Sequence, residues 1–394
     1  MSWRPDRTAV VASGLFVLSC AVAYGGLFSH AYPGDVGTYA GYGRALVLHG
    51  RIPYRDFYVE YPPGAIPVFA LPVLIWNAHY VLVFKLLMTA CGLGFTLCSA
   101  SIVTRLGLSP WRLAPIVLAP VCMGPVFLNR YDPVAALLTS LALVMLLRGS
   151  DRTTGALLGA ATAIKIYPAV LVPIAARRVR SLVGAGAAYV IAAAVLVLPF
   201  FLLAPGGVGY SFWTQLRRHL QIESLGASIL LAVSKLGIHH EGWIDGKPGS
   251  IDLGGFTADA VGLVSSIVAV VLVLVVAWVY WRGPDDDARL VTAWAAAVTG
   301  FVVFGKVLSP QYLTWLVPLV PLAAGRRGMY ATLVFLAALA LSQLEYLADR
   351  FGLRRQDWSV WVLLVRNLGL VATFCFLLAA LRSQGQGAAE PATR

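Results

Sequence analysis

The chain has 394 residues, of which 59% are hydrophobic and only 12% are charged, and its formal net charge is +12. A mean hydropathy of +0.78, with repeated apolar runs, excludes an ordinary soluble domain and indicates a protein of the lipid bilayer. The surplus of Lys and Arg is typical of the cytoplasmic loops that anchor membrane helices, so we expect no nucleic-acid partner.

The first part of the chain predicts membrane segments around a polar outer loop. Residues 8–28 form an uncharged run, which we interpret as an uncleaved first helix running outward rather than as a signal peptide. Residues 29–63 are the expected outer loop. Residues 64–76 are short for a full crossing and contain prolines, so we expect them to dip into the membrane, and residues 80–104 return to the inner side.

The middle of the chain predicts a hairpin and then a broken helix. Residues 113–128 and 134–147 form the expected hairpin. If residues 153–180 formed one helix, the arginines at its end would lie outside. A break at residues 165–168 keeps both basic flanks inside and places Lys165 at the outer tip, and Pro168 disfavours helix just before it. We therefore expect two half-helices, which membranes tolerate where the exposed backbone lines a polar cavity.

The second half predicts one long outer loop, residues 204–257, between further membrane segments. These segments are residues 181–203, 258–281, 290–304, 310–324, 329–346 and 358–381. The expected fold class is all-α, a polytopic transmembrane helical bundle of about eleven membrane segments. We expect a single domain over residues 1–382 and a disordered cytoplasmic tail over residues 383–394.

Two stretches resemble metal sites but favour other interpretations. Asp285-Asp286-Asp287 precedes a helix on the inner side, where carboxylates cap the helix and face its dipole. His239-His240 has no third ligand at a useful spacing, so a zinc site is not expected.

On this topology, the outer face brings together polar residues that are far apart in sequence. They are Asp35, Glu60, Arg130, Asp132, Lys165, Arg217, Arg218, His219, Glu223, Lys306 and Gln311. Such convergence at a membrane face is typical of a binding or catalytic site.

Two of these residues, Asp35 and Lys165, also have plainer interpretations. Asp35 follows a Pro-Gly turn, where an aspartate often bonds its own backbone. Lys165 could snorkel to the lipid headgroups.

Arg366 is harder to dismiss. It lies deep in the last apolar run, and a charge at that depth calls for a partner, for which Glu345, Asp132 or a lipid phosphate are candidates.

Five motifs follow one another along the chain: AYPGDVGTYAGYGRALVLHGRIPYRDFYVEYPP, RYDPVAAL, GALLGAATAIKIYPAVLVP, RRHLQIESLGAS and KVLSPQYLTWLVP. Together they resemble the polyprenol-phosphate-sugar-dependent glycosyltransferases of the GT-C superfamily. Within it, the chain is similar to glycosyltransferase family 87, which includes bacterial α-mannosyltransferases. The Lys-Ile-Tyr-Pro break also resembles the eukaryotic mannosyltransferase of the glycosylphosphatidylinositol pathway.

The resemblance implies a multi-pass enzyme of the bacterial plasma membrane with an extracytoplasmic active site. It implies transfer of a hexose, mannose in particular, from a polyprenyl phosphate to a glycolipid or glycan acceptor, with Asp35 as the catalytic base. The chain departs from the pattern in two places. Val36-Gly37 stands where related enzymes often carry a second acid, and Gln311-Tyr312 stands where some members have a His pair.

The chemistry requires a base for the acceptor hydroxyl and cations for the departing phosphate, and a single displacement inverts the anomeric centre. The candidate phosphate-binding residues are Lys165, Arg217, Arg218, Arg55 and Arg366. The candidate substrate pocket consists of Glu60, Tyr61, Arg130, Asp132, Tyr167, His219, Glu223, Gln311 and Tyr312. Because two cations suffice for one leaving phosphate, we expect neither a metal nor another cofactor.

A membrane transporter or lipid flippase is the alternative, since broken half-helices and a buried arginine are equally natural there. That alternative predicts charged groups at the membrane midplane and on both faces, whereas this sequence crowds its long polar loops on one face. A transferase fold without catalytic activity is a third interpretation, which only an assay distinguishes.

Overall fold

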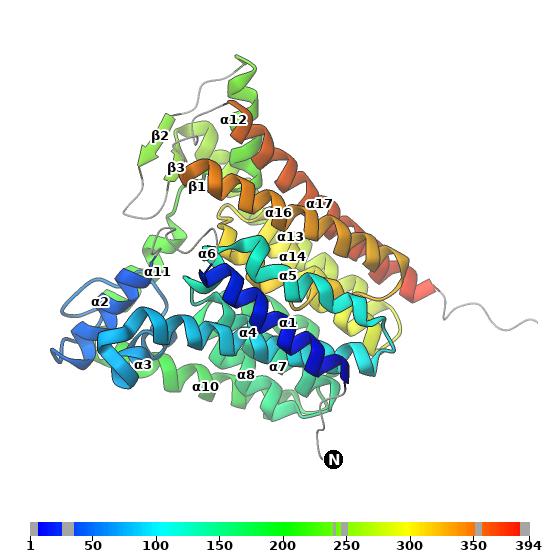
Figure 1. Cartoon of the computed structure of the whole chain (residues 1–394), viewed down its shortest axis with the longest axis horizontal. Coiled ribbons are helices and arrows are strands. Elements are labelled where there is room, and N and C mark those ends of the chain that lie inside the picture. The colour runs from blue at the N-terminus through cyan, green and yellow to red at the C-terminus, as the bar shows by residue number, and fades with distance from the viewer. Residues whose placement is uncertain (1–6, 26–34, 239–241, 246–250, 351–356, 387–394) are drawn as a thin grey trace, which may run out of the picture.

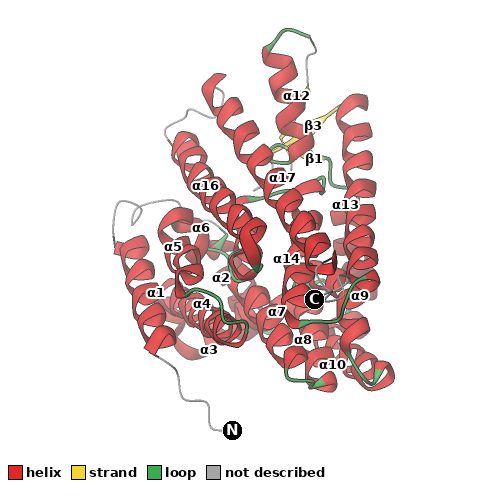
Figure 2. Cartoon of the chain, turned by 90° about the vertical axis from the view of Figure 1, so that its right-hand side faces the viewer, coloured by secondary structure: helices red, strands yellow, loops and turns green. Residues whose placement is uncertain are grey.

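The computed structural model describes residues 7–25, 35–238, 242–245, 251–350 and 357–386, and these are almost entirely helical (Figures 1 and 2). Seven stretches in this part of the chain are long and apolar enough to cross a membrane. They are Arg7–Gly25 (α1), Pro63–Arg105, Leu182–Leu203 (α10), Phe256–Arg282 (α13), Asp287–Phe304 (α14), Gly325–Leu344 and Trp358–Gly385. The expected all-α, polytopic fold class is confirmed.

The remaining helices are shorter or extend these stretches. Their bounds are α2 Val36–Val47, α3 Ile66–Trp76, α4 Tyr80–Arg105, α5 Ala114–Met123, α6 Pro125–Leu128, α7 Asp132–Leu147, α8 Asp151–Ile164, α9 Val172–Arg178, α11 Pro205–Leu216, α12 Leu225–Lys235, α15 Leu313–Leu316, α16 Gly325–Arg350 and α17 Asp357–Gln386. Because α17 continues through Gln386, the first four residues of the expected disordered tail are helical.

The predicted break in the middle of the chain is confirmed. α8 ends at Ile164, Lys165 is extended with φ −144° and ψ 139°, and a 3-10 turn, Tyr167–Leu171, leads into α9. Pro168 lacks a backbone N–H and disfavours a helical residue before it, which explains why α8 does not continue. Lys165 therefore lies just past the end of α8, and the helical periodicity of α8 does not set the direction of its side chain.

Two segments that we expected to be single helices are interrupted. Residues 113–128 are divided into α5 and α6 at Gly124, whose φ of 56° and ψ of −135° suit glycine. Residues 310–324 contain only the short α15 between two 3-10 turns, Pro310–Tyr312 and Val320–Leu322. Three prolines in this stretch remove the backbone donors that a continuous helix needs.

The outer loop expected over residues 204–257 is in fact largely folded. Besides α11 and α12, it contains a three-stranded antiparallel sheet of order β1-β3-β2, made of β1 Leu220–Gln221, β2 Gly242–Asp245 and β3 Ile251–Gly254. Leu220 and Leu253 pair across the sheet and are buried with Leu231 of α12 in a small second core. In Figure 1, α2, α11 and the strands lie at the left end of the bundle, and α17 ends on the right.

Helices α8 and α10 pack closely through two glycines of α8. A Cβ at Gly155 would lie 2.0 Å from the carbonyl oxygen of Ala185, and one at Gly159 would lie 2.1 Å from that of Tyr189. Small residues four positions apart allow membrane helices to approach backbone to backbone.

We expect Gly155→Ala to destabilise the fold by about 1–3 kcal/mol, because the added methyl group forces α8 and α10 apart. The measurement is the thermal unfolding midpoint in detergent. Gly186→Ala, on α10 itself, is the matched control, because a Cβ there meets no atom within 4 Å. Equal midpoints for the two variants would contradict the close contact.

Candidate active site

Asp35 lies at the N-terminal end of α2 with 26% of its side chain exposed. Its Oδ2 atom is ion-paired with Arg130 and accepts hydrogen bonds from the hydroxyls of Tyr61 (3.0 Å) and Tyr39 (3.4 Å). The side chain makes no capping bond to α2, so the structure does not support the plain turn interpretation. Three donors hold one oxygen of this carboxylate, and the adjacent guanidinium favours its ionised form.

Lys165 lies beside Asp132, with 3.3 Å between Nζ and Oδ1. The lysine side chain is 13% exposed and that of Asp132 only 1%. The ammonium also lies over aromatic rings, 4.3 Å from the ring centroid of Tyr131 and 5.6 Å from those of Tyr312 and Trp315. Ring faces attract a cation, so this ammonium has several partners at one place.

One short segment links the two charged pairs. Arg130 and Asp132 stand on either side of Tyr131 where α7 begins; Arg130 pairs with Asp35, and Asp132 pairs with Lys165. Tyr131 is fully buried between them. The start of α7 therefore joins a partly exposed carboxylate and a partly exposed ammonium, which come from two other parts of the chain.

Three stacked rings support the lysine. Trp315 stacks on Tyr167 with centroids 4.0 Å apart and on Tyr312 with centroids 4.2 Å apart, and its Nε1–H donates to Asp132 Oδ1 at 2.8 Å. The hydroxyls of Tyr167 and Thr139 lie 3.1 Å apart, within hydrogen-bond distance. The predicted break and the late Ser-Pro motif thus meet in the folded protein.

Glu60 and Tyr61, at the end of the first outer loop, contact Asp35 and α11. Burial raises the pKa of Tyr61 well above its usual range, and the neighbouring Tyr39 and Glu60 raise it further, so Tyr61 stays protonated and donates to Asp35. The backbone carbonyl of Glu60 accepts a bond from Gln215 Nε2 of α11 at 2.9 Å. Through this bond α11 is attached beside the Asp35 region.

Three basic residues gather at the C-terminal end of α11. The guanidinium of Arg217 lies 4.3 Å from the ring centroid of Trp213, and Lys306 Nζ donates to the carbonyl of Leu216 at 2.7 Å. Burial lowers the pKa of Lys306, and the charge of nearby Arg218 lowers it further. This end of α11 is linked to the Asp35 region through the bond between Gln215 and Glu60.

Arg366, a candidate phosphate ligand, instead has a structural contact. It is fully buried in α17, and its Nη2 donates to the backbone carbonyl of Glu223 at 3.2 Å, as does the Nδ2 of Asn367. Of the partners that we considered, Asp132 pairs with Lys165, and the side chain of Glu345 lies outside the described residues. Arg366 and Asn367 fasten the chain before α12 to α17.

Three other candidates have local partners. Arg55 pairs with Asp56 on the exposed surface of the first loop at 2.9 Å. His219 pairs with Asp259 at 2.8 Å, with both side chains exposed. Gln311 Oε1 accepts a bond of 2.5 Å from the serine hydroxyl two residues earlier.

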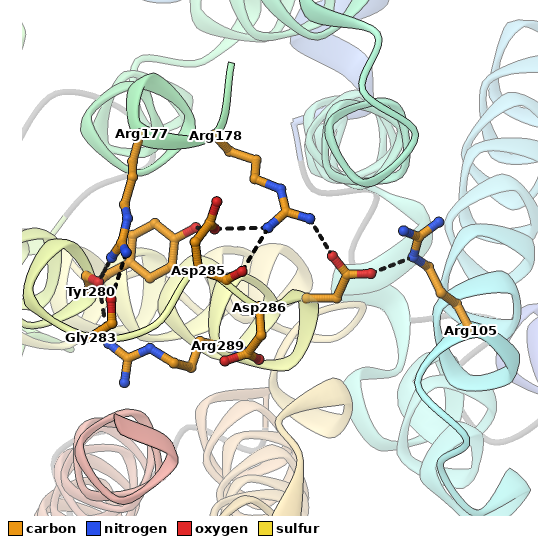
Figure 3. Close-up of polar contacts among 9 residues, drawn as sticks. Arg105, Arg177, Arg178, Tyr280, Gly283, Asp285, Asp286 and Arg289 are labelled. Atoms are coloured by element: carbon orange, nitrogen blue, oxygen red, sulfur yellow. Dashed lines mark hydrogen bonds and ion pairs between the residues drawn. The ribbon is translucent and has the colours of Figure 1, made fainter. Parts of the chain in front are cut away.

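A second charged cluster involves the acidic run that resembled a metal site (Figure 3). Arg178 pairs with both Asp285 (2.8 Å) and Asp287 (2.6 Å), and Arg105 also pairs with Asp287 at 2.7 Å. Asp286 caps α14 through the backbone N–H three residues later, which confirms the predicted cap.

These acids therefore tie α4, α9 and α14 together. Among the described residues, no three His, Cys, Asp or Glu side chains gather as a metal site would require. The pair His239-His240 lies outside those residues.

Trp315, Tyr39 and Tyr131 belong to the site but were not among the candidates of the sequence analysis. Trp315 follows Tyr312 by three positions, and Tyr39 follows Asp35 by four, so each pair would share one face of a helix. That spacing was the available signal. The sequence does not show that Trp315 bonds the distant Asp132, or that Tyr39 bonds Asp35 at the start of its own helix.

The bundle of membrane helices is broken at Lys165 and carries two linked charged pairs next to that break. The model of glycosyltransferase family 87 matches residues 58–310, and that of the mannosyltransferase (PIG-M) family matches residues 254–382. Since the first match covers more than half of the chain, the protein belongs to glycosyltransferase family 87.

One solved structure supports the fold with a TM-score above 0.5. ArnT from Cupriavidus metallidurans bound to undecaprenyl phosphate is 15% identical, with a TM-score of 0.51 over 97% of this chain and 77% of that one. The apo state of ArnT is 16% identical, with a TM-score of 0.48 over 96% of this chain and 78% of that one. No curated protein matches the sequence.

Proposed function

We propose that this membrane glycosyltransferase moves mannose from a polyprenyl phosphate to a lipid-linked or glycan acceptor, with inversion at the anomeric carbon. The match to the PIG-M mannosyltransferase family supports the sugar, and the ArnT complex with undecaprenyl phosphate supports the donor class. The observation that carries the proposal is the linkage of Asp35 and Lys165 through residues 130–132.

In the proposed reaction, Asp35 accepts the proton of the acceptor hydroxyl at Oδ1, while Oδ2 stays bonded to Arg130, Tyr61 and Tyr39. The acceptor oxygen forms the new bond to the anomeric carbon as the bond from that carbon to the phosphate oxygen breaks. The electron pair stays on the phosphate, where Lys165 stabilises the growing negative charge. A cation already in place does so without reorganisation.

We further propose that the end of the bundle carrying this site faces the extracytoplasmic side of the plasma membrane. Arg105 at the end of α4 and Arg178 at the end of α9 both pair with Asp287, on the side that we assigned to the cytoplasm. Arginine-rich short loops are characteristic of the cytoplasmic side.

The substrate proposal is tested by incubating purified protein and membrane lipid extract with labelled sugars on undecaprenyl phosphate, with mannose, glucose and galactose as separate donors. GDP-mannose serves as the comparison. We expect transfer from the undecaprenyl-phosphate mannose alone. Transfer from the nucleotide sugar would contradict the donor class, and preference for another hexose would contradict mannose.

We also propose that catalysis needs no metal ion, because the side chains placed at the reacting groups already supply the positive charge. Transfer is expected to persist within about twofold in 10 mM EDTA, measured as initial rate against an untreated sample. A loss of activity that Mg²⁺ or Mn²⁺ restores would overturn this part of the proposal.

A further inference from the structure

Asp132 is too deeply buried to contact a substrate. Its side chain is 1% exposed, and its Oδ1 atom already faces two donors, Trp315 Nε1 at 2.8 Å and Lys165 Nζ at 3.3 Å. Lys165 is the more exposed of the pair, at 13%. The carboxylate therefore lies deeper in the protein than the ammonium, so a bound ligand would contact Lys165 rather than Asp132.

Lys165 needs something to hold it in place. It stands just after α8 in extended backbone, and its long stem has several rotatable bonds. Asp132 at one end and the ring of Tyr131 at 4.3 Å restrict where the ammonium can lie. Without the carboxylate, the lysine would lose the ion pair that fixes the position of its ammonium.

Asp132 is itself held by a rigid group. Trp315 has a single polar hydrogen, which it gives to Asp132, and its ring lies between those of Tyr167 and Tyr312 at 4.0 and 4.2 Å. The ring stack fixes the indole, the indole orients the carboxylate, and the carboxylate orients the ammonium.

We infer that Asp132 is a positioning residue, held by Trp315, that aims Lys165 at the phosphate of the donor. This inference rests on the proposed function, in which Lys165 receives that phosphate. It removes Asp132 from the set of residues expected to touch substrate and adds Trp315 to the machinery of the site.

The test is a double-mutant cycle of Asp132→Asn and Lys165→Met, with kcat and KM measured for undecaprenyl-phosphate mannose. Asp132→Asn alone is expected to lower kcat about 10- to 100-fold without raising KM, in the range typical of residues that orient a functional group from behind. In the Lys165→Met background, the same change is expected to alter kcat less than about twofold, because there is no ammonium left to aim.

The cycle separates positioning from other roles. If Asp132 touched substrate, or if its loss merely reduced the folded fraction, its effect would be the same in both backgrounds, and the inference would be wrong. Trp315→Phe keeps the ring and removes the N–H, so it is expected to lower kcat in the same direction and to add nothing to Asp132→Asn. An unchanged kcat for either single variant would also overturn the inference.

A binding measurement keeps the inference testable apart from the reaction. The dissociation constant for undecaprenyl phosphate is expected to change at least about threefold on Asp132→Asn in the wild-type background and less than about twofold in the Lys165→Met background. If this coupling holds but no sugar is transferred, the proposed function fails alone. If undecaprenyl phosphate does not bind the wild-type protein, both fail.

Discussion

Asp35→Asn is expected to lower the rate of sugar transfer at least about 100-fold while the protein still folds. The amide keeps the shape of the side chain and can still accept bonds from Tyr61 and Arg130, but it cannot take the proton of the acceptor hydroxyl. The measurement is the initial rate at saturating donor, together with the thermal unfolding midpoint in detergent.

Asp56→Asn is the matched control for this variant. Asp56 lies in the same first loop and also pairs with an arginine, Arg55, but on the exposed surface. Its replacement is expected to change the rate less than about threefold, since exposed ion pairs contribute little. Near-normal turnover of Asp35→Asn would show that another group is the base.

Lys165→Met is expected to lower kcat about 100- to 1,000-fold, because the leaving phosphate loses the cation placed against it. Methionine keeps most of the apolar stem and removes only the ammonium that lies over the rings of Tyr131 and Trp315. The expected signature is a fall in kcat larger than any rise in KM, since the phosphate gains charge as the bond breaks.

Lys85→Met is the matched control for Lys165→Met. The ammonium of Lys85 lies 4.6 Å from the ring centroid of Tyr24, so it too is a lysine over a tyrosine, and its contact is with α1. We expect its rate to stay within about threefold of the wild type. Equal rates for both lysine variants would mean that Lys165 only snorkels to the lipid headgroups and has no catalytic role.

The helix break was predictable because its causes are local. Pro168 disfavours helix before it, and the arginines after it belong with the other basic loops, so the sequence alone placed Lys165 at the end of a half-helix. The cap by Asp286 was predictable for the same reason, since a carboxylate at a helix start acts within a few residues of itself.

The partners in the site were not predictable, because they join distant parts of the chain. Asp35 and Arg130 are each visible as charged residues beside apolar runs, but only the fold shows that they pair. Arg366 has a partner that the sequence did not indicate. Its depth in α17 suggested a phosphate ligand, whereas it bonds a backbone carbonyl before α12, within a folded region that the sequence analysis had taken for loop.

The helices and strands of residues 204–257 were missed because the stretch carries few long apolar runs. α12 is held by one apolar face against α17 and by the cap that Ser224 gives to Ala227. Such short amphipathic elements depend on tertiary packing, which a search for membrane-length hydrophobic runs does not detect.

The anomeric configuration of the product is the most direct test of the account. Purified protein is incubated with membrane lipid extract and an undecaprenyl-phosphate mannose of known configuration, labelled with ¹³C at the anomeric carbon, and the product is examined by NMR. The account predicts a glycoside of opposite configuration, with undecaprenyl phosphate as the second product. A product that retains the configuration of the donor would contradict the single displacement at Asp35, and no product would contradict the proposed donor.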